Sequence, residues 1–266
     1  MATDTDRNIE FPHFKRMALI GVGLIGSSIA LAAKRANLVD SIVGCARTVL
    51  TREKALGLGI VDAMFEDAGE TVAGADLVII CSHLGSYPSV GKAMSSHLAP
   101  GAIVTDVGSV KGCVARDLGP HIPHGVHLVP GHPVSGSEKS GPEAGFEALF
   151  DDRWWILTPG ADADQDAVRT LAAFVKALGS QVEIMDAGRH DLVLAITSHL
   201  PHLIAYNIVN TADDMESVTQ GEVVKFSAGG FRDFTRIAAS DPEFWRDVFL
   251  NNRDAVLETL GRFTED

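Results

Sequence analysis

The sequence is poor in cysteine and in positive charge. Its three cysteines, Cys45, Cys81 and Cys113, are too few and too widely spaced for a disulfide framework or a metal knuckle. Only 22 lysines and arginines stand against 35 aspartates and glutamates, whereas nucleic-acid binding needs clustered basic residues. We therefore expect a cytoplasmic protein with no nucleic-acid partner.

Long hydrophobic runs are scarce as well. Residues 1–10 are polar and have no signal-peptide core. One segment, residues 192–209, is apolar enough to cross a bilayer, but it contains two histidines, a proline and an asparagine, and its flanks are acidic. Its apolar side chains cover nearly the whole circumference of a helix. We expect a helix buried on all sides, between domains or subunits, and no membrane contact.

Short segments rich in β-branched and apolar residues alternate with helical patterns over residues 1–186. Strands that are apolar nearly throughout are typical of a parallel sheet covered on both faces. The alternation predicts an α/β, Rossmann-type domain with a doubly wound, mostly parallel sheet. The expected strands are residues 16–22, 41–46, 76–82, 101–108, 127–133, 154–160 and 181–186, and helices are expected at 51–59, 88–98 and 166–178.

Residues 187–266 show no strand pattern. Their apolar residues recur at helical spacing, which predicts an all-helical C-terminal domain. A domain of about 80 residues offers little surface to cover the apolar helix at 192–209. A second copy of the same helices is expected to cover it, so we predict a homodimer through the C-terminal domain.

Three glycines stand where the first expected strand passes into a helix. Gly21, Gly23 and Gly26, with Leu24 and Ile25 before the last, form the pattern Gly-x-Gly-x-x-Gly. In a dinucleotide-binding domain the first glycine makes a tight turn, the second admits the pyrophosphate, and the third lets helix and strand pack closely. The alternative is a glycine-rich turn without a ligand. The strand–turn–helix context favours a dinucleotide site.

The residues after the second expected strand bear on the choice of cofactor. An NAD site usually has an acidic residue there that binds the ribose 2′-hydroxyl, but the sequence from Gly44 reads Gly-Cys-Ala-Arg-Thr. Arg47 offers a charge-assisted hydrogen bond to a 2′-phosphate, and Thr48 offers a hydroxyl. We predict NADP as the cofactor. NAD, with Arg47 simply solvated, is the alternative.

Two segments that follow later strands carry polar residues suited to catalysis. One contains Asp106 and Ser109, and the other contains His132 and Glu138. Ligands of open α/β sheets lie beyond the carboxyl ends of the strands. Ser109 and His132 are therefore expected to meet over the nicotinamide, with His132 as the proton acceptor. Ser82 and Asp106 are expected to contact the cofactor.

A histidine triplet raises the question of a metal. His121, His124 and His127 lie in a connection rich in proline and glycine, which supplies no acidic residue or cysteine. Structural zinc sites usually combine such ligands at defined spacings. We expect no metal.

Several motifs occur in order along nearly the whole chain: residues 21–26, 106–111, 131–136 with Glu138, 198–202 and 230–236. With these motifs the chain resembles the prephenate and arogenate dehydrogenases of tyrosine biosynthesis, and it looks most like their short bacterial form, cyclohexadienyl dehydrogenase. The resemblance implies oxidation and decarboxylation of a cyclohexadienol such as prephenate or arogenate, driven by aromatisation of the ring. It also implies a dimer through the C-terminal domain.

The resemblance further implies roles for individual residues. His132 would take the hydroxyl proton, Ser109 would hold His132 and the hydroxyl in register, and Arg236 would bind the substrate carboxylate. Tyrosine, which is similar to the substrate, could inhibit at the same pocket. A purely structural pairing of Arg236 with Asp233, three residues before it, is the alternative. Positions that match family residues near the substrate are Asp233, His199, Trp245 and Glu138.

Two other functions remain open at this point. A β-hydroxyacid dehydrogenase also joins a Rossmann domain to a helical domain, but it typically uses a catalytic lysine in the helical part, and Lys176 and Lys225 lie in no matching motif. A non-catalytic NADP-sensing protein would leave the Gly-His-Pro motif and Arg236 unexplained. Prephenate and arogenate, which differ in a keto or an amino side chain, are not separated.

Overall fold

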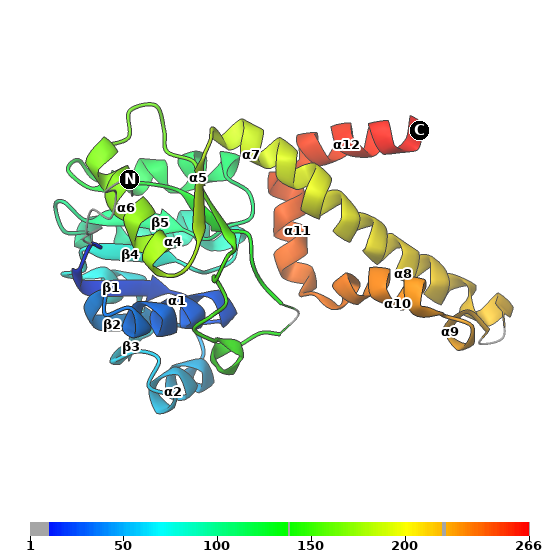
Figure 1. The fold of residues 1–266 in the computed structure, drawn as a ribbon, viewed down its shortest axis with the longest axis horizontal. Helices are drawn as coiled ribbons and strands as arrows, with labels where there is room; N and C mark the ends of the chain where they lie inside the picture. The colour runs from blue at the N-terminus through cyan, green and yellow to red at the C-terminus, as the bar shows by residue number, and fades with distance from the viewer. Residues whose placement is uncertain (1–10, 138, 220–221, 266) are drawn as a thin grey trace, which may run out of the picture.

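The computed structural model describes residues 11–137, 139–219 and 222–265, and in Figure 1 a sheet domain is followed by a projecting helical part. The sheet domain contains a parallel six-stranded sheet in the order β3-β2-β1-β4-β5-β6. This order reverses between β1 and β4, which creates the crevice where α/β proteins bind ligands. The strands are β1 (Phe14–Ile20), β2 (Val39–Cys45), β3 (Ala63–Phe65), β4 (Leu77–Ile80), β5 (Ile103–Asp106) and β6 (His127–Leu128).

Alternating residues of the strands belong to two separate hydrophobic cores, one on each face of the sheet. Met17 and Leu19 of β1 belong to the core that contains residues of α1 (Leu24–Arg35) and α6 (Gln165–Ala177). Their neighbours Ala18 and Ile20 belong to the opposite core, with α3 (Ala68–Val72), α4 (Tyr87–Met94) and α5 (Gly112–Asp117). Burial on both faces explains why these strands are apolar nearly throughout. The predicted doubly wound, Rossmann-type sheet is confirmed.

The expected strand at residues 127–133 proves to be two strands in different sheets. The chain leaves the main sheet after β6, and β7 (Gly131–Pro133) pairs antiparallel with β8 (Trp154–Leu157), which pairs parallel with β9 (Gln181–Ile184). Pro130 lies at the break and has no N–H for a ladder, while its carbonyl accepts a hydrogen bond from Thr158 N. The prediction of one strand was therefore wrong. The sequence pattern also missed β3, which has only three half-buried residues.

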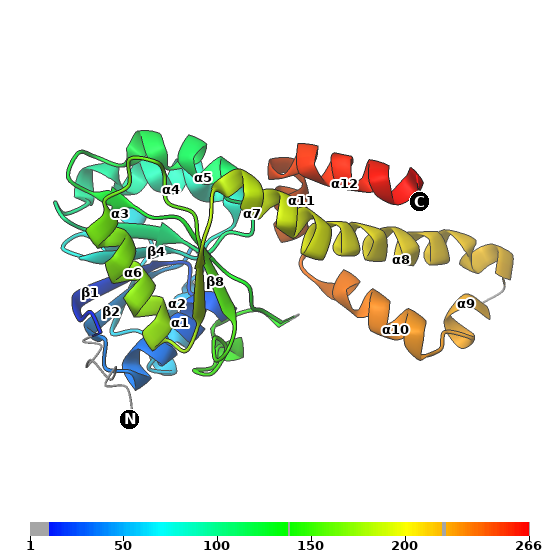
Figure 2. The same ribbon diagram turned by 45° about the horizontal axis from the view of Figure 1, so that its top comes forward.

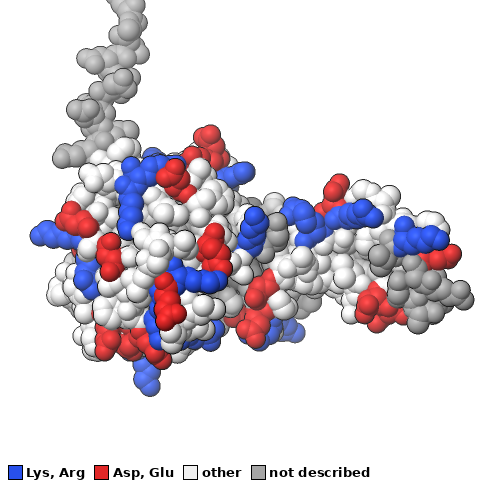
Figure 3. Space-filling model, turned by 90° about the horizontal axis from the view of Figure 1, so that it is seen from below, with Lys and Arg blue, Asp and Glu red and all other residues white. Residues whose placement is uncertain are grey.

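The remaining part of the chain that the structure describes is helical, as predicted. Figure 2 shows α8 (Leu200–Thr219) projecting away from the sheet domain, with α7 (Ala187–Leu194) at the junction of the two parts. The helix continues from α7 into α8 through a π-helical turn, Ala195–His199. Lysine, arginine and acidic side chains are interspersed over both parts on the face seen in Figure 3. The helices not yet named are α2 (Val49–Gly57), α9 (Glu222–Lys225), α10 (Gly229–Thr235), α11 (Pro242–Asn251) and α12 (Arg253–Glu265).

The long helix is not buried on all sides within one chain. Its residues Ala187–Met215 are long and apolar enough to cross a bilayer by length and composition alone. Leu192, Val193 and Ile196 are 42%, 38% and 54% exposed, because the sheet domain and the other helices cover one side only. The single chain therefore leaves one side of this helix uncovered, and that side is apolar. Its burial between subunits stays a prediction.

Candidate active site

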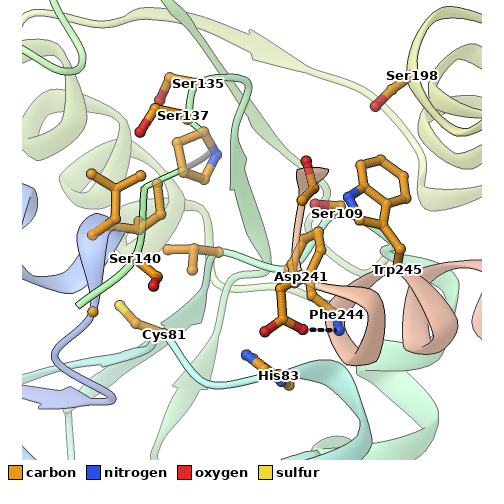
Figure 4. Close-up of a pocket in the computed structure, with 18 of the residues that line it drawn as sticks. Cys81, His83, Ser109, Ser135, Ser137, Ser140, Ser198, Asp241, Phe244 and Trp245 are labelled. Atoms are coloured by element: carbon orange, nitrogen blue, oxygen red, sulfur yellow. Dashed lines mark hydrogen bonds between the residues drawn. The ribbon is translucent and has the colours of Figure 1, made fainter. Parts of the chain in front are cut away.

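A cavity of about 650 Å³ lies at the carboxyl ends of the central strands, between the sheet domain and the helical part. Its wall includes residues that follow β1, β4, β5 and β7, together with residues of the long helix, α11 and the segment before α11. Figure 4 shows residues from both parts around it, among them Ser109 from the sheet domain and Trp245 from α11. The cavity is thus built from segments far apart in the sequence.

The glycine loop forms one end of this cavity and has the geometry that its pattern predicts. Gly21 has a φ of 103°, and a Cβ there would lie 2.8 Å from the carbonyl oxygen of Cys81. A Cβ on Gly26 would overlap the carbonyl oxygen of Gly21, whereas a Cβ on Gly23 would meet no atom within 4 Å. Gly23, Leu24 and Ile25 line the cavity, and α1 begins without a side-chain cap. The open space and the uncapped N–H groups fit a pyrophosphate.

The residues predicted to select the cofactor lie at the end of β2, outside the cavity. Arg47 is exposed, and Thr48 caps α2 by accepting a hydrogen bond of 3.2 Å from Thr51 N. A second arginine, Arg52, donates to the carbonyl oxygen of Ala46 at 2.7 Å and pairs with Glu66. Arg52 was not among the predicted residues. Arg47 therefore follows the end of β2, and the guanidinium of Arg52 lies against the same segment.

His132 lies in β7, lines the cavity and is 6% exposed. Its Nδ1 is 2.8 Å from Nε2 of His190, and Nδ1 of His190 is 2.8 Å from Oδ1 of Asp191. Burial is the largest of the effects that hold the pKa of His132 well below its usual range. His132 is therefore neutral near pH 7, as a general base must be.

Sequence reasoning did not find His190 and Asp191. The adjacent His-Asp pair at the start of the long helix was a visible signal, but His190 meets a partner 58 residues earlier in the chain. The resemblance assigned the orientation of His132 to Ser109. Ser109 lines the cavity, yet among the residues that the structure describes His132 is hydrogen-bonded to His190 and not to Ser109.

Asp106 occupies a different place from the one expected. Its side chain is fully buried and forms an ion pair of 2.5 Å with Lys111, which is also fully buried. It also accepts hydrogen bonds from Tyr87 Oη at 2.8 Å, Gly108 N at 2.8 Å and Gly131 N at 3.2 Å. Lys111 Nζ donates to the carbonyl oxygen of Gly131 at 2.6 Å. The buried Asp106 side chain therefore connects the loop that contains Ser109 to β7 through hydrogen bonds. It does not face the predicted cofactor site.

The other predicted residues divide between the cavity wall and its surroundings. Ser82, Arg236 and Trp245 line the cavity, and the indole of Trp245 stacks on His202 with 3.6 Å between ring centroids. His199 is fully buried behind this wall, where burial lowers its pKa to about 4. Asp233 is exposed on α10 and does not line the cavity. Glu138 lies outside the described residues.

No metal centre is formed by the residues that the structure describes. His121, His124 and His127 belong to no group of three or more His, Cys, Asp and Glu side chains close enough to hold an ion. The polar groups of the cavity, with a neutral histidine and an arginine in its wall, suit acid–base chemistry on an anionic organic substrate.

Comparison with known proteins identifies the family of this chain. The family models described as "Prephenate dehydrogenase, nucleotide-binding domain" and "Prephenate dehydrogenase, dimerization domain" match residues 29–184 and 186–266. Cyclohexadienyl dehydrogenase of Zymomonas mobilis is 40% identical over 95% of this chain and 86% of its own. Prephenate dehydrogenase of Bacillus subtilis is 37% identical over 93% and 67%.

A solved structure has the same arrangement of both parts. It is the prephenate dehydrogenase of A. aeolicus in complex with hydroxyphenyl propionate and NAD+, which superposes with a TM-score of 0.88. The two are 33% identical, and the match covers 94% of this chain and 87% of the other. The family matches, the relatives and the shared structure show that this chain belongs to the prephenate dehydrogenase family.

Proposed function

We propose that this protein oxidises and decarboxylates prephenate, arogenate or both with a nicotinamide cofactor, as a step of tyrosine biosynthesis. The observation that carries the proposal is a neutral, buried histidine, His132, in the wall of a cavity that runs from the glycine loop to Arg236. The names of the relatives support the same chemistry, as does the complex of the A. aeolicus enzyme with NAD+ and an aromatic acid.

The position of His132 in the cavity wall determines its part in the reaction. Its free ring nitrogen accepts the proton of the substrate hydroxyl while hydride leaves the same carbon. The nicotinamide, when bound, supplies the hydride acceptor. The ketone formed is a vinylogous β-keto acid, so the ring carboxylate leaves as carbon dioxide and the ring becomes aromatic.

Two features of the wall suit the substrate. Arg236 carries a planar guanidinium that can bind a carboxylate through two parallel hydrogen bonds. The stacked rings of Trp245 and His202 give a flat surface of a kind that packs against a six-membered ring. We assign carboxylate binding to Arg236 and support of the substrate ring to Trp245.

The proposal is tested by mixing the purified protein with prephenate or arogenate and with NADP or NAD, and recording the absorbance of the reduced nicotinamide. Turnover is expected with at least one pair. The combination with the highest kcat/KM identifies the substrate and cofactor. Failure of all four pairs with folded protein would overturn the proposal.

The choice of NADP over NAD rests on Arg47 and on the absence of an acidic residue after β2. Arg47→Asp is expected to weaken NADP binding by about 2–3 kcal/mol, because a charge-assisted hydrogen bond is replaced by repulsion of the 2′-phosphate. NAD binding should be unchanged or stronger. Titration calorimetry with both cofactors measures this, with Arg169→Asp on exposed α6 as the matched charge control. Equal losses for both cofactors would contradict a contact with the 2′-phosphate.

We also propose a homodimer formed through the uncovered apolar side of the long helix. Leu192, Val193 and Ile196 are exposed there, and the matched C-terminal family model is described as a dimerization domain. We expect a total buried area above about 2,000 Å². Light scattering should give a dimer at micromolar and nanomolar concentrations.

Ile196→Asp tests this interface because it places a charge on the apolar side. Leu56→Asp, on an exposed part of α2 in the sheet domain, is the control. Ile196→Asp should shift the protein to monomer, while the control should stay dimeric. A stable, active wild-type monomer at both concentrations would contradict the proposed dimer.

A cytoplasmic location and inhibition by tyrosine belong to the same proposal. The three cysteines are free, which suits a reducing compartment. Tyrosine has a six-membered ring with an oxygen at C4 and a side-chain carboxylate, as the substrates do. It should therefore compete for the cavity and raise the apparent KM without lowering kcat.

A further inference from the structure

Three hydrogen-bonded side chains lead from the cavity into the start of the long helix. His132 contacts His190, and His190 contacts Asp191, each at 2.8 Å. Both histidines are buried, and Asp191 is 8% exposed. The mechanism described above uses only His132, so it leaves the other two members of this chain without a function.

The hydrogen-bond partners of Asp191 fix its charge state. Its Oδ1 accepts from the backbone N–H of Lys111 at 2.7 Å, and its Oδ2 accepts from that of Gly112 at 2.8 Å. N–H donors on both oxygens stabilise the ionised carboxylate, which can act only as an acceptor. Nδ1 of His190 must therefore carry the proton that lies between His190 and Asp191.

The position of the proton on His190 determines the position of the proton between His190 and His132. A neutral His190 with its proton on Nδ1 presents Nε2 as an acceptor, so Nδ1 of His132 must donate to it. A neutral His132 with its proton on Nδ1 has a free electron pair on Nε2. With one proton on each ring, this is the single arrangement that satisfies both contacts.

We propose that His190 and Asp191 are positioning residues that keep His132 in the tautomer with its electron pair on Nε2. When Nε2 takes the substrate proton, His132 becomes an imidazolium whose Nδ1–H still donates to His190. The Asp191 carboxylate at the far end of the chain stabilises this positive charge. The role resembles that of the carboxylate behind the histidine of a serine protease, with one more histidine between them.

The inference rests on the proposed function, and it links the two parts of the molecule. Asp191 and His190 belong to α7, whereas the N–H groups that hold Asp191 precede or begin α5 of the sheet domain. Asn252, just before α12, donates to the backbone oxygen of Asp191 at 2.8 Å. The base is therefore oriented only when the helical part is docked on the sheet domain.

Other ionisable groups surround this chain and contribute to any pH dependence. They come from the loop after β5, from β5 itself and from the long helix: Lys111, Asp106, His199 and His202. A substitution at His190 replaces none of these residues, but it removes one of the groups that lower the pKa of His199. The shift is therefore interpreted together with the tautomer of His132, which is measured directly.

Two substitutions at His190 separate hydrogen bonding from packing. His190→Phe keeps a ring of similar size but cannot accept a hydrogen bond, whereas His190→Gln places an amide oxygen near the former Nε2. We expect His190→Phe to lower kcat about 100-fold with little change in KM, because the tautomer is no longer held. His190→Gln should retain activity within about tenfold of wild type.

The pH profile gives a readout that a merely structural role would not move. In His190→Phe the protonated form of His132 loses its hydrogen-bond acceptor, Nε2 of His190, and is therefore less stable. The acidic limb of kcat/KM should shift to lower pH in this variant. Val256→Ala, which creates a cavity in α12 next to α7, is the control for loosened packing. It should lower stability and leave the position of that limb unchanged.

The tautomer itself can be measured without substrate. In protein labelled with 15N-histidine, two-bond 1H–15N correlation spectra of the wild type should show His132 protonated on Nδ1, and His190→Phe should change this pattern. A wild-type His132 protonated on Nε2, or equal kcat for His190→Phe and wild type, would overturn the inference. If the tautomer is as inferred but no substrate pair is turned over, the proposed function fails and the positioning role of His190 and Asp191 fails with it.

Discussion

Replacing His132 with asparagine is expected to lower kcat by a factor of about 10² or more. Asparagine is close in size and can still occupy the middle of β7, but it cannot accept a proton near neutral pH. The cavity wall on the cofactor side, formed by the glycine loop, is untouched. Stopped-flow measurement of cofactor reduction gives the rate, and cofactor titration shows that binding is preserved.

The pH dependence of the wild type gives a second test of His132. Burial lowers the pKa of this histidine, so it stays deprotonated, and therefore active as a base, from neutral pH into the acid range. Activity should fall only when the pH drops through this lowered pKa, below the ordinary range for histidine. Turnover of His132→Asn within a few-fold of wild type would remove this residue from the mechanism.

Replacing Asp106 with leucine is expected to lower the free energy of unfolding by about 3–5 kcal/mol. The substitution leaves the ammonium group of Lys111 buried without its counter-charge, although both side chains are fully enclosed in the wild type. It also removes the acceptor for Tyr87 Oη and for two backbone N–H groups. Urea unfolding at one fixed protein concentration measures the change, since association also contributes to stability.

The double variant Asp106→Leu with Lys111→Met identifies the cause of that loss. An apolar pair of similar volume removes the unpaired charge, so it should recover part of the lost stability. A double variant no more stable than Asp106→Leu alone would show that the lost backbone contacts, and not the buried lysine, account for the effect. Because Asp106 ties the Ser109 loop to β7, both variants should also lose activity.

Local patterns in the sequence were enough to predict most of the sheet domain. Successive residues of β1 enter opposite cores, and this double burial is visible in the sequence as an uninterrupted apolar run. The turn at Gly21 needs a positive φ, so glycine is required whatever surrounds it. The switch from apolar strands to helical spacing near residue 187 likewise predicted the all-helical C-terminal part. These features depend on neighbours within a few residues, and local patterns record them.

The tertiary structure decided the features that join distant segments. Sequence reasoning expected Asp106 to face the cofactor, but the fold turns its carboxylate inward to Lys111, since a buried lysine requires a counter-charge. The resemblance implied that Ser109 orients His132, and this role stays a prediction, whereas the hydrogen-bond partner that the fold gives to His132 is His190, 58 residues farther along the chain. Sequence reasoning predicted a helix buried between domains or subunits, and one chain covers only one side of it. The sequence determined which elements form and which residues are chemically able to act. Only the packing of those elements decided which polar groups meet, because buried hydrogen bonds and ion pairs form between side chains that no short-range pattern connects.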